Sequence, residues 1–544
     1  MHDLNQSPGY EGFNAYKDDP MLGLLTLSLK ETVKDGLARM GAWAGNAETI
    51  NLGVLANENE PQLHTHDAKG NRLDRVDFHP AWHALMRRGV DAGLHNSIWQ
   101  ENSEEVGGRN LARAARVYMT SGVEMGHLCP LIMTNASVAT LNANQGVLNE
   151  WLPKILSNKY DPSHKPADMK AGVTIGMGMT ERQGGSDVRA NTTSAEELGN
   201  GVWKVTGEKW FMSAPMCDAF LVLAQMKEGL GCFLLPRILE GGKSNGLEFR
   251  RLKKKLGNRS NASSEVEFRD SLGILVGEPG QGIRTIMDMV GFTRLDCAVA
   301  SAGLMRTSLA EAVHHCRHRS AFGKKLIDQP LMERVLADLV LDVSAATALT
   351  FRLASSFDRA PANPEEAAYA RLMTPVIKYW VCKSAPSLIY EAMECLGGNG
   401  YIETSNLPRH FREAPLNAIW EGAGNIMCLD LLRVISKSGE VLDTVLEGIQ
   451  RDLGGDEYGK VIDVLKSASR MAKEDQGGAR ILIEQLAYTA AAAELKRIGA
   501  GETADAFIET RLGGLWRSTY GMLDNRYNAR AIIEKDYPAF GAAS

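Results

Sequence analysis

A stretch of β-type sequence between two long helical stretches most strongly restricts the fold of this 544-residue chain. From about residue 172 to residue 276, short runs rich in β-branched and aromatic residues alternate with Gly, Asn and Asp, as in Ala219-Phe-Leu-Val-Leu-Ala-Gln225. Before and after this stretch, apolar residues recur at helical spacing, as they do at Trp82, Leu85 and Met86. The sequence therefore predicts a β-domain that lies between helical domains in the chain.

We accordingly predict an α+β multidomain fold with four consecutive parts. These are an N-terminal mainly helical domain at residues 1–171, a central β-domain at 172–283, a helical bundle at 284–437 and a C-terminal helical extension at 438–544. The bundle is expected to contain three long helices, at Arg294 to His318, Leu331 to Phe357 and Glu365 to Leu396. Polar and turn-forming residues from Asn57 to Phe78 predict a long loop.

Composition and charge narrow the classes of protein. Lys and Arg number 60 against 66 Asp and Glu, so the net charge of −6 gives no global attraction to nucleic acid or to an anionic membrane. The N-terminus carries no signal-peptide pattern and no apolar run reaches about 18 residues, so we expect a cytoplasmic protein without a membrane partner. The eight cysteines form no Cys-x-x-Cys pair, which predicts buried free thiols. We predict no metal site, because the pair His314 and His318 lacks a third ligand nearby.

Two segments of the β-domain are suited to a flat polar ligand. In Met179-Thr-Glu-Arg-Gln-Gly-Gly-Ser-Asp187, adjacent glycines let backbone N–H groups approach a ligand closely, and Thr180 and Ser186 can donate hydrogen bonds. The strand pattern before Ser213 places Phe211 and Ser213 on one face, which suits stacking on a heterocycle together with one hydrogen bond. Taken alone, the first segment is also typical of an ordinary turn, and the second of a core strand.

Three segments of the helical bundle also carry candidate ligand-binding groups. Arg319 can grip a pyrophosphate while Phe322 covers an adenine, although a solvated basic turn has the same sequence. Gly397 and Gly398 permit close backbone approach to an anion. Glu421 lies between apolar neighbours, which raise the pKa of a carboxylate toward the range useful to a general base; the alternative is a partly exposed turn residue.

The order and spacing of these motifs resemble the acyl-CoA dehydrogenase family over roughly residues 80 to 435. The resemblance implies an N-terminal α-helical domain, a β-barrel-like domain and a C-terminal helical bundle, with FAD at their junction, acyl-CoA as substrate and a homotetramer as the assembly. It also implies an oxidoreductase acting on a CH–CH bond. Glu421 matches the family's catalytic base, which removes the α-proton of the thioester while hydride passes from the β-carbon to the flavin.

The resemblance extends to individual contacts. Ser186 and Arg294 are expected near the substrate. Some relatives carry the base just before the bundle arginine, but Thr293 stands there in this chain, which leaves Glu421 as the candidate. The residues expected to bind the cofactor are Met177, Met179, Thr180, Gly184, Gly185, Ser186, Phe211, Met212, Ser213, Arg319, Phe322, Gly397, Gly398, Ala423 and Asn425.

Departures from the common family pattern point to one branch of the family. Arg182 and Gly184 replace the usual Pro and Ala, and Gly291 replaces an Asp that contacts CoA in some members, so the departures concern CoA more than FAD. Longer segments, among them Leu55-Ala-Asn-Glu-Asn-Glu-Pro61 and Ile419-Trp-Glu-Gly-Ala-Gly-Asn-Ile-Met-Cys428, resemble the AidB branch, which is associated with the adaptive response to DNA alkylation. This branch implies an extra C-terminal helical domain, weak or vestigial dehydrogenase activity and association with double-stranded DNA.

The C-terminal region is not basic overall, since Ser438 to Ser544 contains 13 Lys and Arg against 17 Asp and Glu. A local basic face is still expected from Arg511, Arg517, Arg526 and Arg530, the last two placed one helical turn apart. Arginines on a solvated helix or in a subunit interface are an equally good interpretation.

Three functions compete at this point. The first is an FAD-containing flavoprotein of the AidB type with weak activity and DNA association. The second is a metabolic acyl-CoA dehydrogenase that uses Glu421 on a short or branched acyl thioester. The third is a DNA-protecting protein in which FAD is purely structural.

Overall fold

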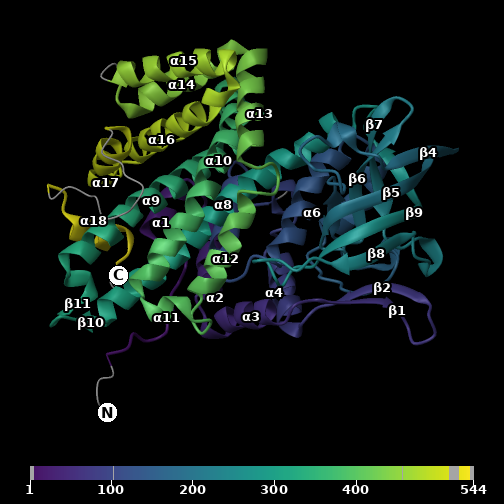
Figure 1. Cartoon of the computed structure of the whole chain (residues 1–544), viewed down its shortest axis with the longest axis horizontal. Coiled ribbons are helices and arrows are strands. Elements are labelled where there is room, and N and C mark those ends of the chain that lie inside the picture. The colour runs from purple at the N-terminus through teal and green to yellow at the C-terminus, as the bar shows by residue number, and fades with distance from the viewer. Residues whose placement is uncertain (1–4, 102, 456–457, 514–525, 539–544) are drawn as a thin grey trace. The chain divides into compact units, whose positions relative to one another are not determined.

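The computed structural model describes residues 5–101, 103–455, 458–513 and 526–538. Contacts within the chain divide it into two compact units, each built from segments that are far apart in sequence. The first unit contains Met1–Ile50, Glu104–Val123 and Arg294–Ser544, and the second contains Asn51–Ser103 and Glu124–Thr293. Figure 1 labels their helices and strands. The units are interleaved along the chain, so the boundaries of four consecutive domains stay a prediction.

Seven strands of the second unit form one mixed sheet (Figure 1). Their order is β3-β6-β4-β5-β9-β7, β8 pairs with β9, and β6 also pairs with β7. Because β7 bonds to both β9 and β6, five of the strands close into a ring, which confirms the predicted barrel-like domain. The strands are β3 (Ile175–Gly178), β4 (Ser194–Gly199), β5 (Val202–Ser213), β6 (Ala219–Met226), β7 (Gly229–Pro236), β8 (Leu247–Leu252) and β9 (Ser263–Val276).

Helices α4 (Pro80–Asp91), α6 (Leu128–Leu141) and α7 (Gln145–Ile155) belong to the same unit. α4 buries Trp82, Leu85 and Met86, the residues whose spacing predicts a helix. α6 packs against β3. The side chain of Asn144 accepts a hydrogen bond from the Val147 N–H at 3.2 Å and caps the start of α7.

The long loop predicted between Asn57 and Phe78 is wrong, because this segment contains an antiparallel hairpin. Its strands are β1 (Gln62–His66) and β2 (Arg72–Asp77), with Leu63 opposite Val76. Asp67 Oδ1 accepts the backbone N–H groups of Lys69 and Asn71, both at 2.8 Å, and closes the turn. Both strands are largely exposed and mostly polar, so their sequence lacks the apolar alternation that usually predicts strands.

Three long helices dominate the first unit, and they confirm the predicted bundle. They are α8 (Gly282–His318), whose first turns belong to the second unit, α9 (Pro330–Arg359) and α10 (Pro364–Cys395). Proline occupies the first position of α9 and α10, where its missing N–H costs nothing. Asn363 caps α10 by accepting the Glu365 N–H at 2.9 Å.

Shorter helices complete the first unit. α3 (Ala47–Glu58) begins in this unit and ends in the other. The remaining helices are α1 (Pro20–Leu25), α2 (Glu31–Ala44), α5 (Arg109–Ser121), α11 (Gly398–Tyr401), α12 (Leu407–Asn417), α13 (Gly424–Lys437), α14 (Gly439–Leu453), α15 (Gly459–Glu474), α16 (Ala479–Arg497), α17 (Glu502–Phe507) and α18 (Ala529–Asp536). α16 contacts α9, α10 and α14, and its buried alanines allow this close approach. The C-terminal region is therefore helical, as predicted.

The cysteines and the helices also bear on two expectations from composition. All eight cysteines are buried and free, which confirms the prediction of buried thiols. Within the part of the chain that the structure describes, no helix combines the length and apolar character needed to span a membrane.

Candidate active site

In the second unit, a tight glycine-rich turn follows β3. The Glu181 N–H donates to the Gly184 carbonyl at 3.3 Å, and the Gly184 N–H donates to the Glu181 carbonyl at 3.1 Å. A Cβ atom at Gly185 would lie 2.3 Å from Thr180 Oγ1, so only glycine fits there without a shift. The turn leaves Gly184, Gly185 and Ser186 exposed, with their backbone groups accessible to a ligand.

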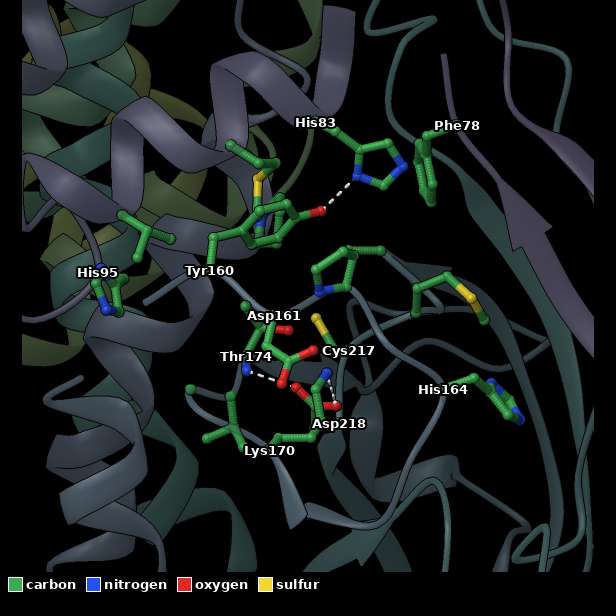
Figure 2. A pocket seen from close by; sticks show the side chains of 18 of the residues that line it. Phe78, His83, His95, Tyr160, Asp161, His164, Lys170, Thr174, Cys217 and Asp218 are labelled. Carbon is green, nitrogen blue, oxygen red and sulfur yellow. Dashed lines mark hydrogen bonds and ion pairs between the residues drawn. The ribbon is translucent and has the colours of Figure 1, made fainter. Parts of the chain in front are cut away.

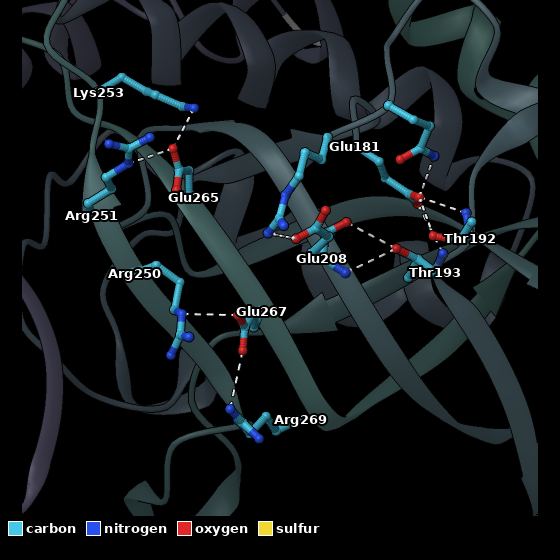
Figure 3. Close-up of polar contacts among 12 residues, drawn as sticks. Glu181, Thr192, Thr193, Glu208, Arg250, Arg251, Lys253, Glu265, Glu267 and Arg269 are labelled. Carbon is cyan, nitrogen blue, oxygen red and sulfur yellow. Dashed lines mark hydrogen bonds and ion pairs between the residues drawn. The ribbon is translucent and has the colours of Figure 1, made fainter.

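The side chain of Glu181, which is fully buried, holds this turn through hydrogen bonds to neighbouring segments (Figure 3). Its Oε1 accepts from Lys209 Nζ at 2.7 Å and from the Thr193 N–H at 3.1 Å, while its Oε2 accepts from the Thr192 N–H at 2.6 Å. Burial raises the pKa of Glu181, but the hydrogen bonds from Gln183, Lys209 and Thr192 outweigh it and lower that pKa to about 2. Glu181 is therefore ionised at neutral pH.

The end of β5 presents the aromatic face that the sequence predicts. Phe211 is 52% exposed, whereas Met212 is fully buried and can offer a ligand only its backbone. The Ser213 and Ser263 hydroxyls are hydrogen-bonded at 3.2 Å. The backbone N–H of Trp210 donates to the Thr180 carbonyl at 2.8 Å, so the turn and the aromatic face lie side by side. The structure thus brings the predicted cofactor residues of this unit together at the ends of β3 and β5.

Cations that the sequence analysis did not single out surround this aromatic face. Lys253 Nζ lies 3.6 Å from the ring centroid of Trp210 and 4.6 Å from that of Phe211. Lys253 and Arg251 both pair with Glu265, at 2.6 and 2.7 Å (Figure 3). The surface beside Phe211 therefore combines aromatic rings with positive charge.

In the first unit, Glu421 occupies a strained turn between α12 and α13. Its φ of 59° lies in the left-handed region, which is costly for a residue with a Cβ. Lys378 Nζ donates to the Trp420 carbonyl at 2.8 Å and to the Gly422 carbonyl at 2.6 Å. Arg294 Nε donates to the Glu421 carbonyl at 3.0 Å. Two buried cations thus fix three consecutive carbonyls, and the surroundings of Glu421 are more polar than its sequence neighbours predict.

Arg294 has a structural task that differs from the one expected. Arg294 is only 5% exposed, and its NH1 group pairs with Asp430 at 2.7 Å. Asp430 and the Glu421 carbonyl occupy NH1 and Nε of its guanidinium, and the expected contact of Arg294 with substrate stays a prediction. Arg294 holds the turn that carries Glu421.

Phe322 stands at the tip of a small hairpin after α8. The strands β10 (Ser320–Ala321) and β11 (Lys324–Lys325) pair around Phe322 and Gly323, which both have positive φ, at 52° and 79°. Phe322 is 98% exposed at this tip. Arg319, just before the hairpin, donates from NH1 to the Asn5 carbonyl at 2.6 Å.

The glycine pair and the start of α13 complete the predicted residues of the first unit. Gly397 has a φ of 59°, and a Cβ atom at Gly397 or Gly398 would meet open space. Both glycines are exposed, Gly397 just before α11 and Gly398 at its first position. Ala423 precedes α13, and Asn425 Oδ1 accepts from Arg480 Nε at 2.9 Å.

Three of the four arginines predicted to face DNA lie in the described residues, and these three do not form one basic face. Arg511 is buried and pairs with Asp338 at 2.6 Å and with Asp342 at 3.0 Å, so it is a structural residue and its assignment to DNA is wrong. Arg526 lies in a turn before α18, which corrects its expected place one helical turn from Arg530. Arg526 pairs with Glu509, and Arg530 pairs with Asp328 and Glu333. Arg517 lies outside the described residues.

Sequence reasoning missed Lys209 and Lys378, which fix the turn after β3 and the turn at Glu421. Lys378 lies among apolar residues on the buried side of α10. A single lysine in such a stripe is unusual, and this was the sign in the sequence that it has a specific partner. Lys209 precedes a register shift between β5 and β9, which lets both Lys209 and Met212 point inward. A sequence does not reveal such a bulge.

Comparison with known families agrees with this architecture. Residues 5–162 match the family described as "Adaptive response protein AidB N-terminal domain". Residues 176–271 match "Acyl-CoA dehydrogenase, middle domain", and residues 280–436 match "Acyl-CoA dehydrogenase, C-terminal domain".

Individual relatives cover most of the chain. AidB of Escherichia coli (strain K12) is 46% identical over 480 residues, which are 88% of each chain. Acyl-CoA dehydrogenase family member 11 of Caenorhabditis elegans is 32% identical over 460 residues, or 81% of this chain and 74% of the relative. The crystal structure of Caenorhabditis elegans ACDH-11 in complex with C11-CoA has a TM-score of 0.84 at 26% identity, covering 100% of this chain and 98% of that one. The chain belongs to the acyl-CoA dehydrogenase family of oxidoreductases, within its AidB branch.

Proposed function

We propose that this protein is an FAD-containing acyl-CoA dehydrogenase of the AidB type with weak activity toward acyl-CoA thioesters. The observation that carries the proposal is the Glu421 turn, where a strained carboxylate-bearing residue is held by two buried cations, Lys378 and Arg294. Strain of this kind persists only where surrounding structure enforces it, and it gathers at functional sites. Membership of a dehydrogenase family gives the turn its chemical interpretation.

The residues of each unit fit one part of FAD. In the second unit, the exposed ring of Phe211 and the Ser213 hydroxyl suit the flat isoalloxazine ring, and the turn after Thr180 offers backbone donors. In the first unit, Arg319 and the exposed Phe322 suit the pyrophosphate and the adenine. Gly397 and Gly398 suit a phosphate group of the FAD that is bound to a second copy of the chain, because no atom fills the space beside them.

Bound FAD supplies the hydride acceptor. The Glu421 carboxylate takes the α-proton of the thioester, and the Glu421 backbone N–H donates to the thioester carbonyl as negative charge develops there. Lys378 and Arg294 keep the turn in one geometry, so that the carboxylate reaches the α-proton while the N–H reaches the carbonyl oxygen. Ser186 borders the substrate.

Weak activity follows from what this chain lacks for CoA. Position 291 is glycine, and a Cβ atom there would meet open space, so no side chain replaces the carboxylate that contacts CoA in some relatives. Loss of a remote contact reduces the binding energy available to orient the reacting carbons.

We also propose a homotetramer that works in the cytoplasm. Large apolar side chains of the first unit are strongly exposed, which supports burial against other copies; they are Phe322, Leu331, Tyr390, Tyr401 and Ile402. Eight buried free cysteines suit a reducing compartment.

An absorbance spectrum of the purified protein tests the cofactor directly. We expect flavin bands, or their appearance when FAD is added to the colourless protein, with a reduced amplitude in Phe211→Ala. A protein that neither carries flavin nor takes it up would overturn the proposal. Sedimentation at several concentrations tests the tetramer.

A DNA partner is a second proposal, supported by the match to the adaptive-response family in residues 5–162. Arg526 is the predicted arginine that keeps most exposure in the described residues, with 57% of its side chain accessible. Gel retardation of a short duplex across a salt series tests this proposal, since phosphate contacts predict weaker binding at higher salt. Retention that is independent of salt, or no retardation at low salt, would contradict it.

A further inference from the structure

A cavity of about 520 Å³ lies within the second unit (Figure 2). It is bordered by α4, by the end of β2, by the segment 157–174 and by the loop between β5 and β6. Its volume is in the range of small-molecule sites, about 300–1,000 Å³. None of the residues assigned above to FAD or to the thioester lines it. Figure 2 shows a hydrogen bond between His83 and Tyr160 on one wall, and Asp218 held by Lys170 and Thr174 on another.

One wall of the cavity is aromatic. The rings of Phe78 and Trp82 are stacked with centroids 3.9 Å apart and planes at 16°. Trp82 is 5% exposed, and its indole N–H has no hydrogen-bond partner among the described residues. Because the indole N–H is itself buried, this wall offers a ligand ring surface and no accessible hydrogen-bond donor.

The cavity also contains a positive charge, the guanidinium of Arg237, a residue that is 5% exposed. Its Nε donates to the Cys217 carbonyl at 2.9 Å, and its NH1 donates to His164 Nδ1 at 2.7 Å. Among the described residues, no carboxylate oxygen lies within 4.0 Å of the guanidinium. Burial, together with the charges of Arg237, Arg75 and Lys170, lowers the pKa of His164 to about 4, so His164 is neutral at pH 7 and accepts this bond without adding charge.

The carboxylates that line the cavity already have donors of their own. Asp218 pairs with Lys170 at 2.6 Å, and Asp77 pairs with Arg75 at 2.8 Å. Asp161 accepts from the Ser163 hydroxyl at 2.5 Å and from the Ala171 N–H at 3.0 Å. Among the described residues that line the cavity, Arg237 is therefore the buried cation with no carboxylate in contact, although the charge of Asp218 acts on it from farther away. A contacting carboxylate would pair this buried charge directly.

We propose that this cavity is a second ligand site, which binds a small organic carboxylate with an apolar or aromatic body. Its carboxylate pairs with the Arg237 guanidinium, and its body lies against the stacked rings of Phe78 and Trp82. A carboxylate satisfies a guanidinium with two parallel hydrogen bonds, and an aromatic wall favours a flat or aliphatic chain over a highly hydrated ion.

Calorimetric titration of the full-length, FAD-loaded protein tests this site with three acids and their primary amides: phenylacetate, 2-naphthylacetate and octanoate. We expect at least one acid to bind saturably and at least tenfold more tightly than its amide. Phe78→Leu removes one ring of the stack, and we expect about threefold to tenfold weaker binding of the aromatic acids. Arg237→Lys keeps the charge but removes the paired donors, and we expect a larger loss.

Arg250→Lys, the same substitution at an exposed arginine of β8 outside the cavity, is the matched control, and binding of the acid is expected to be unchanged. The proposal is overturned if no acid binds, if acids and amides bind equally, or if Arg237→Lys binds the acids as tightly as the parent protein. The site is independent of the proposed dehydrogenase function, so a colourless or inactive protein that still discriminates acid from amide supports the site alone.

Discussion

The carboxylate of Glu181 and the ammonium group of Lys209 lie 2.7 Å apart, and neither side chain has any exposed surface. This ion pair ties the glycine-rich turn after β3 to the inner face of β5. Burial lowers the pKa of Lys209 to about 8 despite the opposing effect of Glu181, which shows how much the pair depends on its partners. The pair fixes the turn without approaching the ligand surface itself.

Removing one member of this pair should be costly. We expect Glu181→Gln to destabilise the protein by about 3 kcal/mol, because it leaves a buried ammonium group unpaired. The double variant Glu181→Gln/Lys209→Met should recover at least half of that loss. Thermal denaturation followed by fluorescence measures both. Arg182→Gln, which breaks the exposed pair with Glu208, is the control and should cost less than about 1 kcal/mol. Equal losses in Glu181→Gln and Arg182→Gln would contradict the role of the buried pair.

Acid stability should report the same carboxylate. The pKa of Glu181 is lowered from 4.5 to about 2 in the folded protein, so the unfolded chain takes up the proton first as the pH falls. Stability from this group is complete above pH 4.5 and is lost as the pH falls toward 2. Urea denaturation between these values should show a steeper decline for the parent protein than for Glu181→Gln/Lys209→Met. An identical decline in the two proteins would argue against a depressed pKa at Glu181.

Lys378 should matter for turnover although it does not reach the substrate. We expect Lys378→Met to lower kcat by about tenfold or more with a smaller change in KM, because the turn that carries Glu421 loses two of its three fixed carbonyls. Steady-state kinetics with an artificial electron acceptor measures this. Lys383→Met, on the same helix but exposed, is the control. A kcat unchanged in Lys378→Met would show that the turn needs no such support.

Arg511 and Arg526 should separate stability from DNA association. We expect Arg511→Ala to lower stability by about 3–5 kcal/mol, because Asp338 and Asp342 are left buried without their cation. Arg526→Ala should change stability by less than about 1 kcal/mol, since its pair with Glu509 is exposed. Melting temperatures and gel retardation of the same two variants test this contrast. Weaker DNA binding by a fully stable Arg511→Ala protein would reverse our assignment.

The sequence predicted the class of the fold and the ends of several elements well. The change from helical spacing to β-branched runs located the barrel, and the helices predicted from Leu331 and Glu365 begin one residue earlier, at Pro330 and Pro364. The glycine-rich turn could also be predicted, because its shape depends on neighbouring residues. Thr180 lies so close to Gly185 that only glycine fits there. Local chemistry of this kind is written in a few neighbouring residues.

Features that depend on distant partners were not predictable. The polar hairpin β1–β2 gave no apolar alternation, and Arg511 reads like a surface residue until Asp338 and Asp342 are placed beside it. The same holds for Arg294, whose pairing with Asp430 joins residues 136 positions apart. Long-range pairing decides whether a charged residue binds a ligand or supports the fold, and one sequence does not specify it.

Whether Glu421 acts as the base toward a thioester can be measured by anaerobic titration with a panel of short and branched acyl-CoA thioesters, followed by flavin absorbance. We expect at least one thioester to bleach the flavin of the parent protein and of the exposed-surface control Glu440→Gln. In Glu421→Gln we expect the flavin bands to be retained and bleaching to slow by about 10²–10⁴-fold. Equal bleaching of the parent protein and Glu421→Gln, or no bleaching of the parent protein by any thioester, would contradict this role of Glu421.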